Sequence, residues 1–345
     1  MREIAVIGDH FMLPEAFEDS LKTICKAEIS VRSMIQPWPD EPMEHGYATQ
    51  GMEGLKEYMG APDEIVAFID TAEVLVTHLA PVSRAMLENL PHLKFIAVSR
   101  GGPVNIDVEA AREKGVVVVN TPGRNASAVA EFTLGAMLAE TRKIRVGHEA
   151  LRQGQWRGDL YRADTTGREL NELTVGVIGY GDIGKRVVTL LKAFGAKVLV
   201  HDPYIQLSAQ DTREGVQLAE FDTLLEQSDV VTMHPRVTEE TTGMMDEDAF
   251  DRMKPGAVFI NTARGPLVDY DALYDALTSG HLAGAMLETF AVEPAPPDWP
   301  LLQLPNVTLT PHIAGASVRT VTYAAEQIAM EVDRYFSGLE PINLQ

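Results

Sequence analysis

Residues 175–185 read Val-Gly-Val-Ile-Gly-Tyr-Gly-Asp-Ile-Gly-Lys, and this stretch decides the fold. Its largely apolar start predicts a buried strand, which runs into Gly179, Gly181 and Gly184, spaced as GxGxxG. In a strand–turn–helix with this spacing, the first glycine permits a tight turn and the second lets a pyrophosphate approach the backbone. The third lets the helix pack closely against the strand. We therefore expect a dinucleotide-binding βαβ unit here; the alternative is an ordinary strand–turn–helix without a ligand.

The residues after the glycines complete this pattern. A helical stretch covers 186–194, and a second apolar strand, 197–200, leads to Asp202. A carboxylate at that position accepts hydrogen bonds from a ribose 2′-hydroxyl, whereas a 2′-phosphate would meet like-charge repulsion, so we expect NAD rather than NADP. The pyrophosphate is expected at the start of the helix, beside Asp182 and Ile183, because free amide N–H groups and the helix dipole favour an anion there.

The composition limits the partners of the chain. With 345 residues, of which 45% are apolar, the chain is long enough for two domains with substantial cores. Its 29 Lys and Arg residues against 50 Asp and Glu residues give a formal net charge of -21, which argues against nucleic acid and anionic membrane surfaces. The one cysteine, Cys25, cannot form an intramolecular disulfide or a cysteine-based zinc site, and no metal site is expected. Because the sequence shows neither a signal-peptide pattern nor an apolar run of membrane-spanning length, we expect a cytoplasmic protein.

Strands and helices alternate along the first third of the chain. Strands are expected at 4–7, 65–68, 74–77, 95–98 and 116–119, helices at 14–26 and 83–90, and a proline-rich loop at 36–42. This alternation predicts a parallel sheet covered by helices.

The rest of the chain predicts a second unit of the same class. A long, largely apolar helical stretch, 126–152, comes first; a bridge between domains, a subunit interface and core burial each explain it. Further strands are expected at 230–233, 258–261, 283–286 and 307–310, and a last helix, 316–337, is expected to return to the first domain. The predicted fold class is α/β, with two Rossmann-like domains built on parallel sheets and a cleft for a small molecule between them. The domains are a discontinuous, flavodoxin-like substrate domain, 1–122 with 318–345, and an NAD-binding domain, 123–317.

Three charged or titratable residues follow expected strands of the second unit. Arg264 lies in a short Ala-Arg-Gly turn, Glu293 precedes a proline, and His312 lies in Pro-His-Ile-Ala-Gly. Ligands in open α/β sheets bind at the carboxyl ends of the strands, so these side chains are expected to converge beside the dinucleotide. Oxidation of an alcohol by NAD needs a group that takes the hydroxyl proton, and histidine titrates near neutral pH.

These three residue types fit one reaction. A carboxylate beside an imidazole fixes its tautomer and stabilises the imidazolium, and a guanidinium binds a carboxylate bidentately and polarises a carbonyl oxygen. Glu293, His312 and Arg264 fit these roles. Taken singly, each has an ordinary explanation: a surface histidine, a solvated glutamate, an arginine paired with an acid. Their joint placement beside a dinucleotide site favours catalysis.

With these motifs in place, the chain resembles the D-isomer-specific 2-hydroxyacid dehydrogenase family, which includes phosphoglycerate, glycerate and formate dehydrogenases and glyoxylate/hydroxypyruvate reductases. The resemblance spans about 65–338 and is carried by 175–184, 202–203, 261–269, 281–294 and 304–315. It implies NAD as cofactor, two Rossmann-like domains, a homodimer, and catalytic roles for Arg264, Glu293 and His312. It also implies that NAD contacts the glycine-rich turn and Asp202, together with His234, Thr262, Ala263, Arg264, Glu288, His312 and Gly315.

Two positions depart from the usual pattern of the family, and a third argues against one of its activities. Glu288 stands where the family often has Asp near the nicotinamide carboxamide, which keeps an acceptor on a longer side chain. Arg236 adds a charge to the run after His234, and it either lies near the nicotinamide ribose or points to solvent. Formate dehydrogenases typically have Gln at the position of Glu293, so the acid argues against that activity.

The loop 99–107, Ser-Arg-Gly-Gly-Pro-Val-Asn-Ile-Asp, is a candidate substrate-binding segment. The family commonly has a glycine-rich turn before Asn-x-Asp at this place. Arg100 and the N–H groups of Gly101 and Gly102 would form an anion-binding nest at the end of a strand.

Two roles are open for Arg100. It either contacts a second polar or anionic group of the substrate, while Arg264 takes the carboxylate, or it pairs with one of the many carboxylates of the chain. Arg124 is a further candidate for the same face.

Together these features predict an NAD-dependent oxidoreductase that interconverts a D-2-hydroxy acid and its 2-oxo acid, with a small molecule as its substrate. In the reductive direction Arg264 binds the carboxylate and the carbonyl oxygen, a hydride passes from the nicotinamide to C2, and His312, held by Glu293, supplies the proton. The alternative is an NAD-responsive interaction module, the role that the same fold has in corepressors of the C-terminal-binding-protein type.

Overall fold

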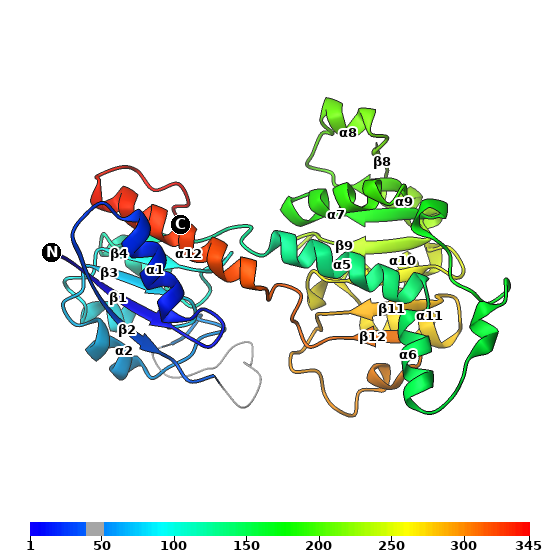
Figure 1. The fold of residues 1–345 in the computed structure, drawn as a ribbon, viewed down its shortest axis with the longest axis horizontal. Helices are drawn as coiled ribbons and strands as arrows, with labels where there is room; N and C mark the ends of the chain where they lie inside the picture. The colour runs from blue at the N-terminus through cyan, green and yellow to red at the C-terminus, as the bar shows by residue number, and fades with distance from the viewer. Residues whose placement is uncertain (39–51) are drawn as a thin grey trace. The chain divides into compact units, whose positions relative to one another are not determined.

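In the computed structural model, which describes residues 1–38 and 52–345, the chain forms two compact units. One unit combines Met1–Asn125 with Ala316–Gln345, and the other is Ala126–Gly315. Each unit has its own parallel sheet with helices on both faces (Figure 1). The α/β class with two parallel sheets is therefore the one that the sequence predicts.

The first unit is built on five parallel strands. Their order is β2-β1-β3-β4-β5, the flavodoxin-like order, which reverses direction between β1 and β3. Most of these strands are short apolar runs buried on both faces, as expected where helices cover both sides of a parallel sheet. The strands are β1 (Arg2–Gly8), β2 (Ile29–Ile35), β3 (Val74–Thr77), β4 (Phe95–Val98) and β5 (Val117–Val119).

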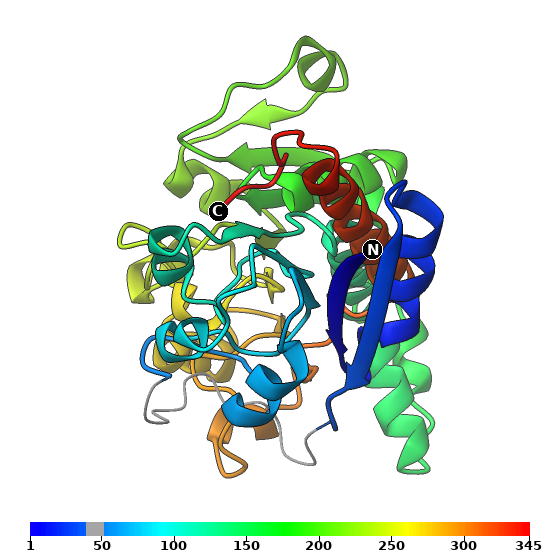
Figure 2. The same cartoon turned by 90° about the vertical axis from the view of Figure 1, so that its left-hand side faces the viewer.

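Two helices far apart in the sequence cover one face of this sheet. α1 (Pro14–Ile24) packs beside α12 (Val318–Phe336), and both contribute to the core that includes Ile4 and Val6 of β1. Figure 2 shows α1 and α12 together on one side of the first sheet. The other face is covered by α2 (Pro62–Ile69), α3 (Arg84–Glu88) and α4 (Val108–Glu113).

The sequence-based prediction for this unit is wrong at 65–68, which is part of α2 and not a strand. Pro62 and two acidic residues occupy the first turn, where a missing N–H and negative charge favour a helix, and Ile65 and Ile69 bury one side of it. A short apolar run does not by itself separate a buried strand from a buried helix. The edge strand β2, four of whose seven residues are polar or exposed, was not predicted. Of the expected loop 36–42, residues 39–42 lie outside the described part of the chain.

The second unit has seven parallel strands in the order β12-β11-β10-β9-β6-β7-β8. This is the doubly wound order of dinucleotide-binding folds with one further strand, and it reverses between β6 and β9. The strands are β6 (Thr174–Ile178), β7 (Lys197–His201), β8 (Gln217–Leu218), β9 (Val230–Met233), β10 (Val258–Asn261), β11 (Gly284–Leu287) and β12 (Val307–Leu309).

Alternate residues of these strands face two helical layers. One core contains Val175 and Val177 with side chains of α5 (Ala126–Thr141) and α7 (Asp182–Ala193). The other contains Ile178 with side chains of α9 (Phe221–Gln227), α10 (Glu247–Arg252) and α11 (Tyr270–Thr278). The remaining elements are α6 (Ile144–Arg152), α8 (Ala209–Arg213) and four 3-10 segments, Gly158–Tyr161, Leu170–Glu172, Gly265–Leu267 and Pro300–Gln303.

The expected single helix at 126–152 is two helices, α5 and α6. The break falls at Lys143, whose φ of 57° is left-handed and cannot continue an α-helix. Within the ranges that the structure describes, no helix is long and apolar enough to cross a membrane.

Candidate active site

The candidate residues of the second unit lie at one edge of its sheet, where the parallel strands end. Because β12, β11, β10, β9, β6 and β7 are successive neighbours, the loops that follow them are neighbours too. In this order the loops carry His312, then Glu288 with Glu293, then Arg264, His234, Gly179 and Asp202. The sheet order therefore brings the glycine-rich turn and the three catalytic candidates to the same edge.

The glycine-rich turn has the geometry that a dinucleotide needs. Gly179 has a φ of 88°, and a Cβ atom there would lie 2.7 Å from the carbonyl carbon of His234, across the reversal between β6 and β9. A Cβ on Gly184 would lie 2.1 Å from the Gly179 oxygen, so α7 packs as closely as the spacing predicts. Among the described residues, no atom would lie within 4 Å of a Cβ on Gly181, the N-cap of α7. The backbone of Gly181 is therefore open to a ligand beside free helical N–H groups, and the residues present fit a dinucleotide.

Asp202 lies directly after β7 and is tied to this turn. Its Oδ2 accepts the N–H of Tyr180 at 2.8 Å, and its Oδ1 accepts the N–H of Tyr204 at 3.0 Å. An ionised carboxylate has about four acceptor positions, so further hydrogen bonds from ribose hydroxyls are available to it. Asp182 and Ile183 are the first two residues of α7.

His234 follows β9 and is neutral at physiological pH. Burial lowers its pKa to about 3. Its Nε2 lies 3.1 Å from the hydroxyl of Thr232, and its Nδ1 is buried with no hydrogen-bond partner in the described part of the chain. Arg236, two residues later, is exposed. Of the two alternatives for this side chain, the structure therefore shows the one in which it points to solvent.

The loop that carries Arg264 is fixed by Asn261, the last residue of β10. The Asn261 side chain accepts the N–H of Ala263 and donates to the carbonyl of Arg264, both at 3.0 Å. Thr262 is buried, with its hydroxyl 2.8 Å from that of Thr133 in α5. Arg264 itself is exposed, and in the ranges that the structure describes no carboxylate forms an ion pair with it. Its guanidinium is thus available for an anionic ligand.

Glu293 and His312 are in direct contact. Nδ1 of His312 lies 2.7 Å from Oε2 of Glu293, and Oε1 of Glu293 accepts the N–H of Phe290 at 2.8 Å. The Arg264 loop adjoins this segment, since a Cβ on Gly265 would lie 1.9 Å from the Phe290 oxygen.

Glu288 is fully buried and supports the loop of His312. It accepts the hydroxyl of Thr310 in a short hydrogen bond and the N–H of Ala314 at 2.6 Å, and its carbonyl accepts the N–H of His312 at 3.0 Å. Burial raises the pKa of Glu288, although these hydrogen bonds oppose it. His312 has a φ of 54°, so the loop turns sharply at that residue. Gly315, which closes the loop, is partly buried.

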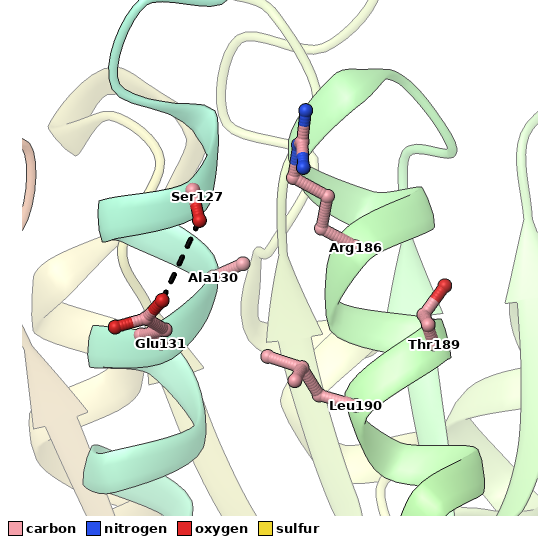
Figure 3. A pocket seen from close by; sticks show the side chains of 6 residues that line it. All are labelled: Ser127, Ala130, Glu131, Arg186, Thr189 and Leu190. Carbon is pink, nitrogen blue, oxygen red and sulfur yellow. Dashed lines mark hydrogen bonds between the residues drawn. The ribbon is translucent and has the colours of Figure 1, made fainter. Parts of the chain in front are cut away.

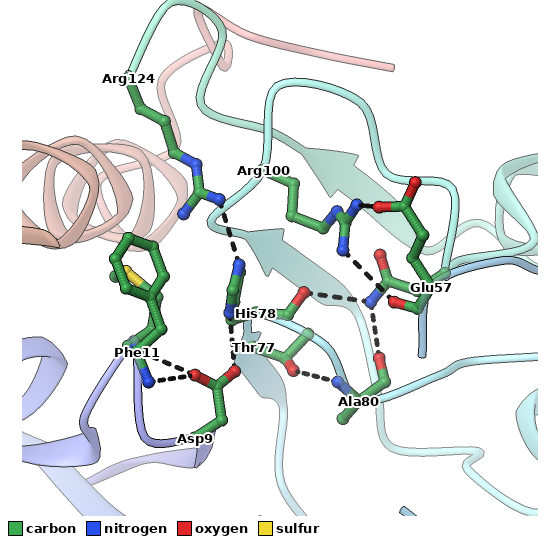
Figure 4. Close-up of polar contacts among 10 residues, drawn as sticks. Asp9, Phe11, Glu57, Thr77, His78, Ala80, Arg100 and Arg124 are labelled. Atoms are coloured by element: carbon green, nitrogen blue, oxygen red, sulfur yellow. Dashed lines mark hydrogen bonds and ion pairs between the residues drawn. The ribbon is translucent and has the colours of Figure 1, made fainter. Parts of the chain in front are cut away.

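The candidate substrate loop of the first unit begins directly after β4. Arg100 forms a short ion pair with Glu57 and also donates to the Glu57 carbonyl at 3.3 Å (Figure 4). The structure therefore shows the second of the two roles left open for Arg100, pairing with a carboxylate of the chain. A Cβ on Gly101 or Gly102 would meet no atom of the described residues within 4 Å, so both backbones are open.

Asp9 and His78 are absent from the sequence-based candidates, yet the structure brings them together at this edge. Nδ1 of His78 lies 2.6 Å from Oδ2 of Asp9, and Nε2 of His78 lies 3.1 Å from Nη2 of Arg124. Only the position of Asp9 and His78 in the sequence could have indicated this site, because each residue comes directly after a buried strand.

A shallow pocket of about 200 Å³ lies elsewhere in the second unit, between α5 and α7 (Figure 3). It is lined by Ser127, Ala130, Glu131, Arg186, Thr189 and Leu190. None of these residues belongs to the glycine-rich turn or to the catalytic candidates, so the pocket is separate from the site described above.

Comparison with known proteins identifies the family of the chain. Residues 134–314 match the family model described as D-isomer specific 2-hydroxyacid dehydrogenase, NAD binding domain. The protein YoaD of Bacillus subtilis, named as a 2-hydroxyacid dehydrogenase, is 35% identical over 331 residues, which cover 94% of this chain and 95% of YoaD. A glyoxylate reductase of Thermofilum pendens is 36% identical over 83% of this chain and 85% of its own. The chain belongs to the D-isomer-specific 2-hydroxyacid dehydrogenase family.

The match to other relatives and structures defines the class further. A D-3-phosphoglycerate dehydrogenase of Mycobacterium tuberculosis is 37% identical over 80% of this chain, but the chain spans only about half (51%) of that relative. The crystal structure of the TT0316 protein from Thermus thermophilus is similar over 99% of both chains, with a TM-score of 0.78 and 29% identity. The protein is thus an NAD-dependent dehydrogenase acting on D-2-hydroxy acids, and these likenesses do not favour the corepressor-like module.

Proposed function

We propose that this enzyme interconverts a D-2-hydroxy acid and its 2-oxo acid through a His312–Glu293 proton relay and an Arg264 anchor. The observation that carries the proposal is the 2.7 Å contact between Nδ1 of His312 and Glu293, at the strand edge that also holds the glycine-rich turn. NADH held at this edge would supply a hydride to the carbonyl carbon of the 2-oxo acid. The chain must then supply a proton to the carbonyl oxygen and hold the carboxylate.

Each of the three residues has one task in this proposal. With Nδ1–H donating to Glu293, Nε2 is the atom of His312 that gives a proton to the carbonyl oxygen and takes it back in the oxidative direction. Glu293 fixes this tautomer and stabilises the imidazolium. Arg264, exposed and without an ion-pair partner among the described residues, binds the carboxylate of the substrate bidentately.

We propose NAD contacts for the residues that line the same edge. Gly179, Gly181, Asp182, Ile183 and Gly184 would hold the pyrophosphate, and Asp202 the adenosine ribose. Thr262, Ala263 and Arg264 lie on the neighbouring loop, and His234, Glu288, His312 and Gly315 complete the set. The support for a contact between Glu288 and NAD is indirect, since the two oxygens of its carboxylate already accept hydrogen bonds from Thr310 and Ala314.

The first unit is proposed to bind the substrate. Gly101 and Gly102 offer open backbone N–H groups after β4, and Arg100 adds positive charge beside them. Because Arg100 is held by Glu57, its contribution is expected to be modest and to depend on the substrate.

The test is a panel of 2-oxo acids with NADH and NADPH, followed by nicotinamide absorbance. We expect reduction of at least one acid such as glyoxylate or hydroxypyruvate, with NADH preferred. Arg264→Gln should raise KM strongly, whereas Arg252→Gln, which changes an exposed arginine of α10, should leave the kinetics unchanged. Wild-type KM values in Arg264→Gln would contradict the proposed binding of the substrate carboxylate by Arg264.

We also propose a homodimer and a cytoplasmic location. Support for the dimer comes from large apolar side chains exposed on and after α6: Ile144, Leu151, Trp156 and Tyr161, the last two 85% and 95% exposed. Light scattering on the purified protein should give twice the chain mass, and Trp156→Ser should shift it toward the monomer. A monomer at micromolar concentration would contradict the dimer, and fractionation of cells tests the location.

A further inference from the structure

The first unit carries a polar cluster that the proposed relay in the second unit does not use. The order of its sheet reverses between β1 and β3, and ligands of doubly wound sheets bind outside the carboxyl ends of the strands at such a reversal. Asp9 comes directly after β1, and His78 directly after β3. Their side chains meet at this place, and Arg124 reaches His78 from the other side (Figure 4).

The protons in this row of three side chains can be assigned. A guanidinium only donates hydrogen bonds, so Nε2 of His78 accepts from Arg124 and Nδ1–H donates to Asp9. Burial lowers the pKa of His78 to about 4 despite the neighbouring carboxylate, which leaves the ring neutral near pH 7. Asp9 in turn accepts the N–H groups of Phe11 and Met12, both at 2.8 Å. The row is therefore anchored to the backbone at its acidic end.

The guanidinium of Arg124 is held but not saturated. Nη2 is bound to His78, and the group lies over the ring of Phe11, 5.7 Å from its centroid. Nη1 is buried and has no hydrogen-bond partner in the described part of the chain. A buried donor without an acceptor is costly, and an oxygen of a ligand would remove that cost.

Arg124 is a cation of this edge that has no direct carboxylate partner in the described part of the chain. Burial, followed by the nearby charge of Arg100, lowers the pKa of Arg124 to about 10, so the guanidinium of Arg124 stays charged near neutral pH. Glu57 neutralises Arg100 and the carboxylate of Asp9 is separated from Arg124 by the imidazole. In a chain of formal net charge -21, such a local arrangement is what an anionic ligand requires.

We propose that Arg124 binds an oxyanion, a carboxylate or a phosphate of a small organic acid, at the strand reversal of the first unit, and that Asp9 and His78 position its guanidinium. This inference rests on the proposed function for the identity of the ligand: a 2-hydroxy or 2-oxo acid that carries a second anionic group. A carboxylate and a phosphate offer the same oxygen acceptors to a guanidinium, so the experiment separates them.

Calorimetric titration of the full chain with matched 2-hydroxy acids, in the presence of NADH so that the bound acid is not oxidised, tests the inference. Tartronate differs from glycolate by a second carboxylate, and D-3-phosphoglycerate differs from D-glycerate by a phosphate. We expect the member of one pair that carries the additional anionic group to bind about 10- to 100-fold more tightly than its partner, the range of one charge-assisted hydrogen bond. The pair that shows the preference identifies the group. Equal affinities within both pairs for the wild-type protein would overturn the proposal, whatever the variants do.

Variants show which residue is responsible for the tighter binding of acids with an additional anionic group. Arg124→Gln should abolish it while the monoanionic acids still bind, and Asp9→Asn should reduce it, because the row that orients Arg124 is weakened. Arg112→Gln, an exposed arginine of α4, should keep the full preference. A preference that survives in folded Arg124→Gln would place the anion elsewhere and contradict the assignment.

Turnover separates the two proposals. Reduction of glyoxylate by NADH, without tighter binding of the acids that carry an additional anionic group, would contradict the oxyanion site and leave the proposed function intact. A binding preference that depends on Arg124, without reduction of any 2-oxo acid, would support the oxyanion site and contradict the proposed function.

Discussion

Nδ1 of His312 lies 2.7 Å from Oε2 of Glu293, and the other oxygen of Glu293 accepts the N–H of Phe290 at 2.8 Å. The backbone N–H of Phe290 thus holds one oxygen of the carboxylate, and the other oxygen holds the imidazole. The side chain of Glu293 is 13% exposed and that of His312 is 38% exposed, so the support is shielded while the ring keeps an accessible edge. A histidine that exchanges a proton with a bound substrate needs this combination.

Replacing Glu293 with glutamine tests this contact. Glu293→Gln keeps the shape but removes the charge, and we expect kcat to fall about 10- to 100-fold, since a hydrogen bond to a charged group contributes about 1.5–3 kcal/mol. Binding of NADH, measured by fluorescence, should not change. Glu226→Gln, an exposed glutamate of α9, is the matched control. An unchanged kcat in Glu293→Gln would show that the contact is structural only.

Asp202 is expected to set the preference for NADH over NADPH. Its carboxylate is held by the N–H groups of Tyr180 and Tyr204 at the turn of the dinucleotide site. Asp202→Ser removes a negative charge that would repel a 2′-phosphate, an effect of about 1 kcal/mol per unit charge even in water. The ratio of kcat/KM for NADH to that for NADPH should therefore fall about tenfold or more. A ratio equal to that of the wild type would contradict the assignment of Asp202.

Glu288 is expected to hold the loop that carries His312. Glu288→Asp shortens a fully buried side chain that reaches both Thr310 and Ala314, so one of the two hydrogen bonds should be lost. We expect a lower melting temperature, equivalent to about 1–3 kcal/mol, together with a lower kcat. Glu288→Gln, which keeps the length, should lose less of both. Wild-type stability and turnover in Glu288→Asp would show that the longer side chain has no such role.

Two histidines with lowered pKa values predict acid-sensitive stability. The pKa of His234 is lowered by burial from 6.5 to about 3, and that of His78 to about 4. As the pH falls below 6.5, these residues bind protons in the unfolded state but not in the folded one. The free energy of unfolding should therefore fall with pH, by up to about 1.4 kcal/mol per pH unit for each histidine.

His234→Gln isolates one of these contributions. Urea unfolding between about pH 6.5 and 4 should show a shallower loss of stability in the variant than in the wild type, because one titrating group is gone. The carboxylates titrate in both proteins, so their effect cancels in the comparison. Identical slopes would mean that His234 is not protonated more readily after unfolding.

Local patterns predicted the second unit better than the first. The spacing of Gly179, Gly181 and Gly184 encodes its own turn, and each catalytic candidate lies in the loop that follows a short apolar strand. The order of the strands then places these residues at one edge, as open α/β sheets require. In the first unit the contact of His78 with Asp9 joins residues 69 positions apart. Nothing in the local sequence of either residue specifies that contact.

Two other features depend on tertiary structure in the same way. The apolar run 65–68 fits a strand or a helix, and burial of one side against the sheet of the first unit decides for the helix α2. The partner of Arg100 is Glu57, 43 residues away, chosen from the many carboxylates of the chain. Sequence alone therefore left both roles of Arg100 open.

The most direct test of the proposed relay is the kcat of His312→Ala with a 2-oxo acid that the wild type reduces, measured together with its affinity for NADH. The account predicts that kcat falls about 10²- to 10⁴-fold, the usual contribution of a general acid, while NADH binds as before. Turnover at the wild-type rate in His312→Ala would show that another group supplies the proton, and would contradict the account.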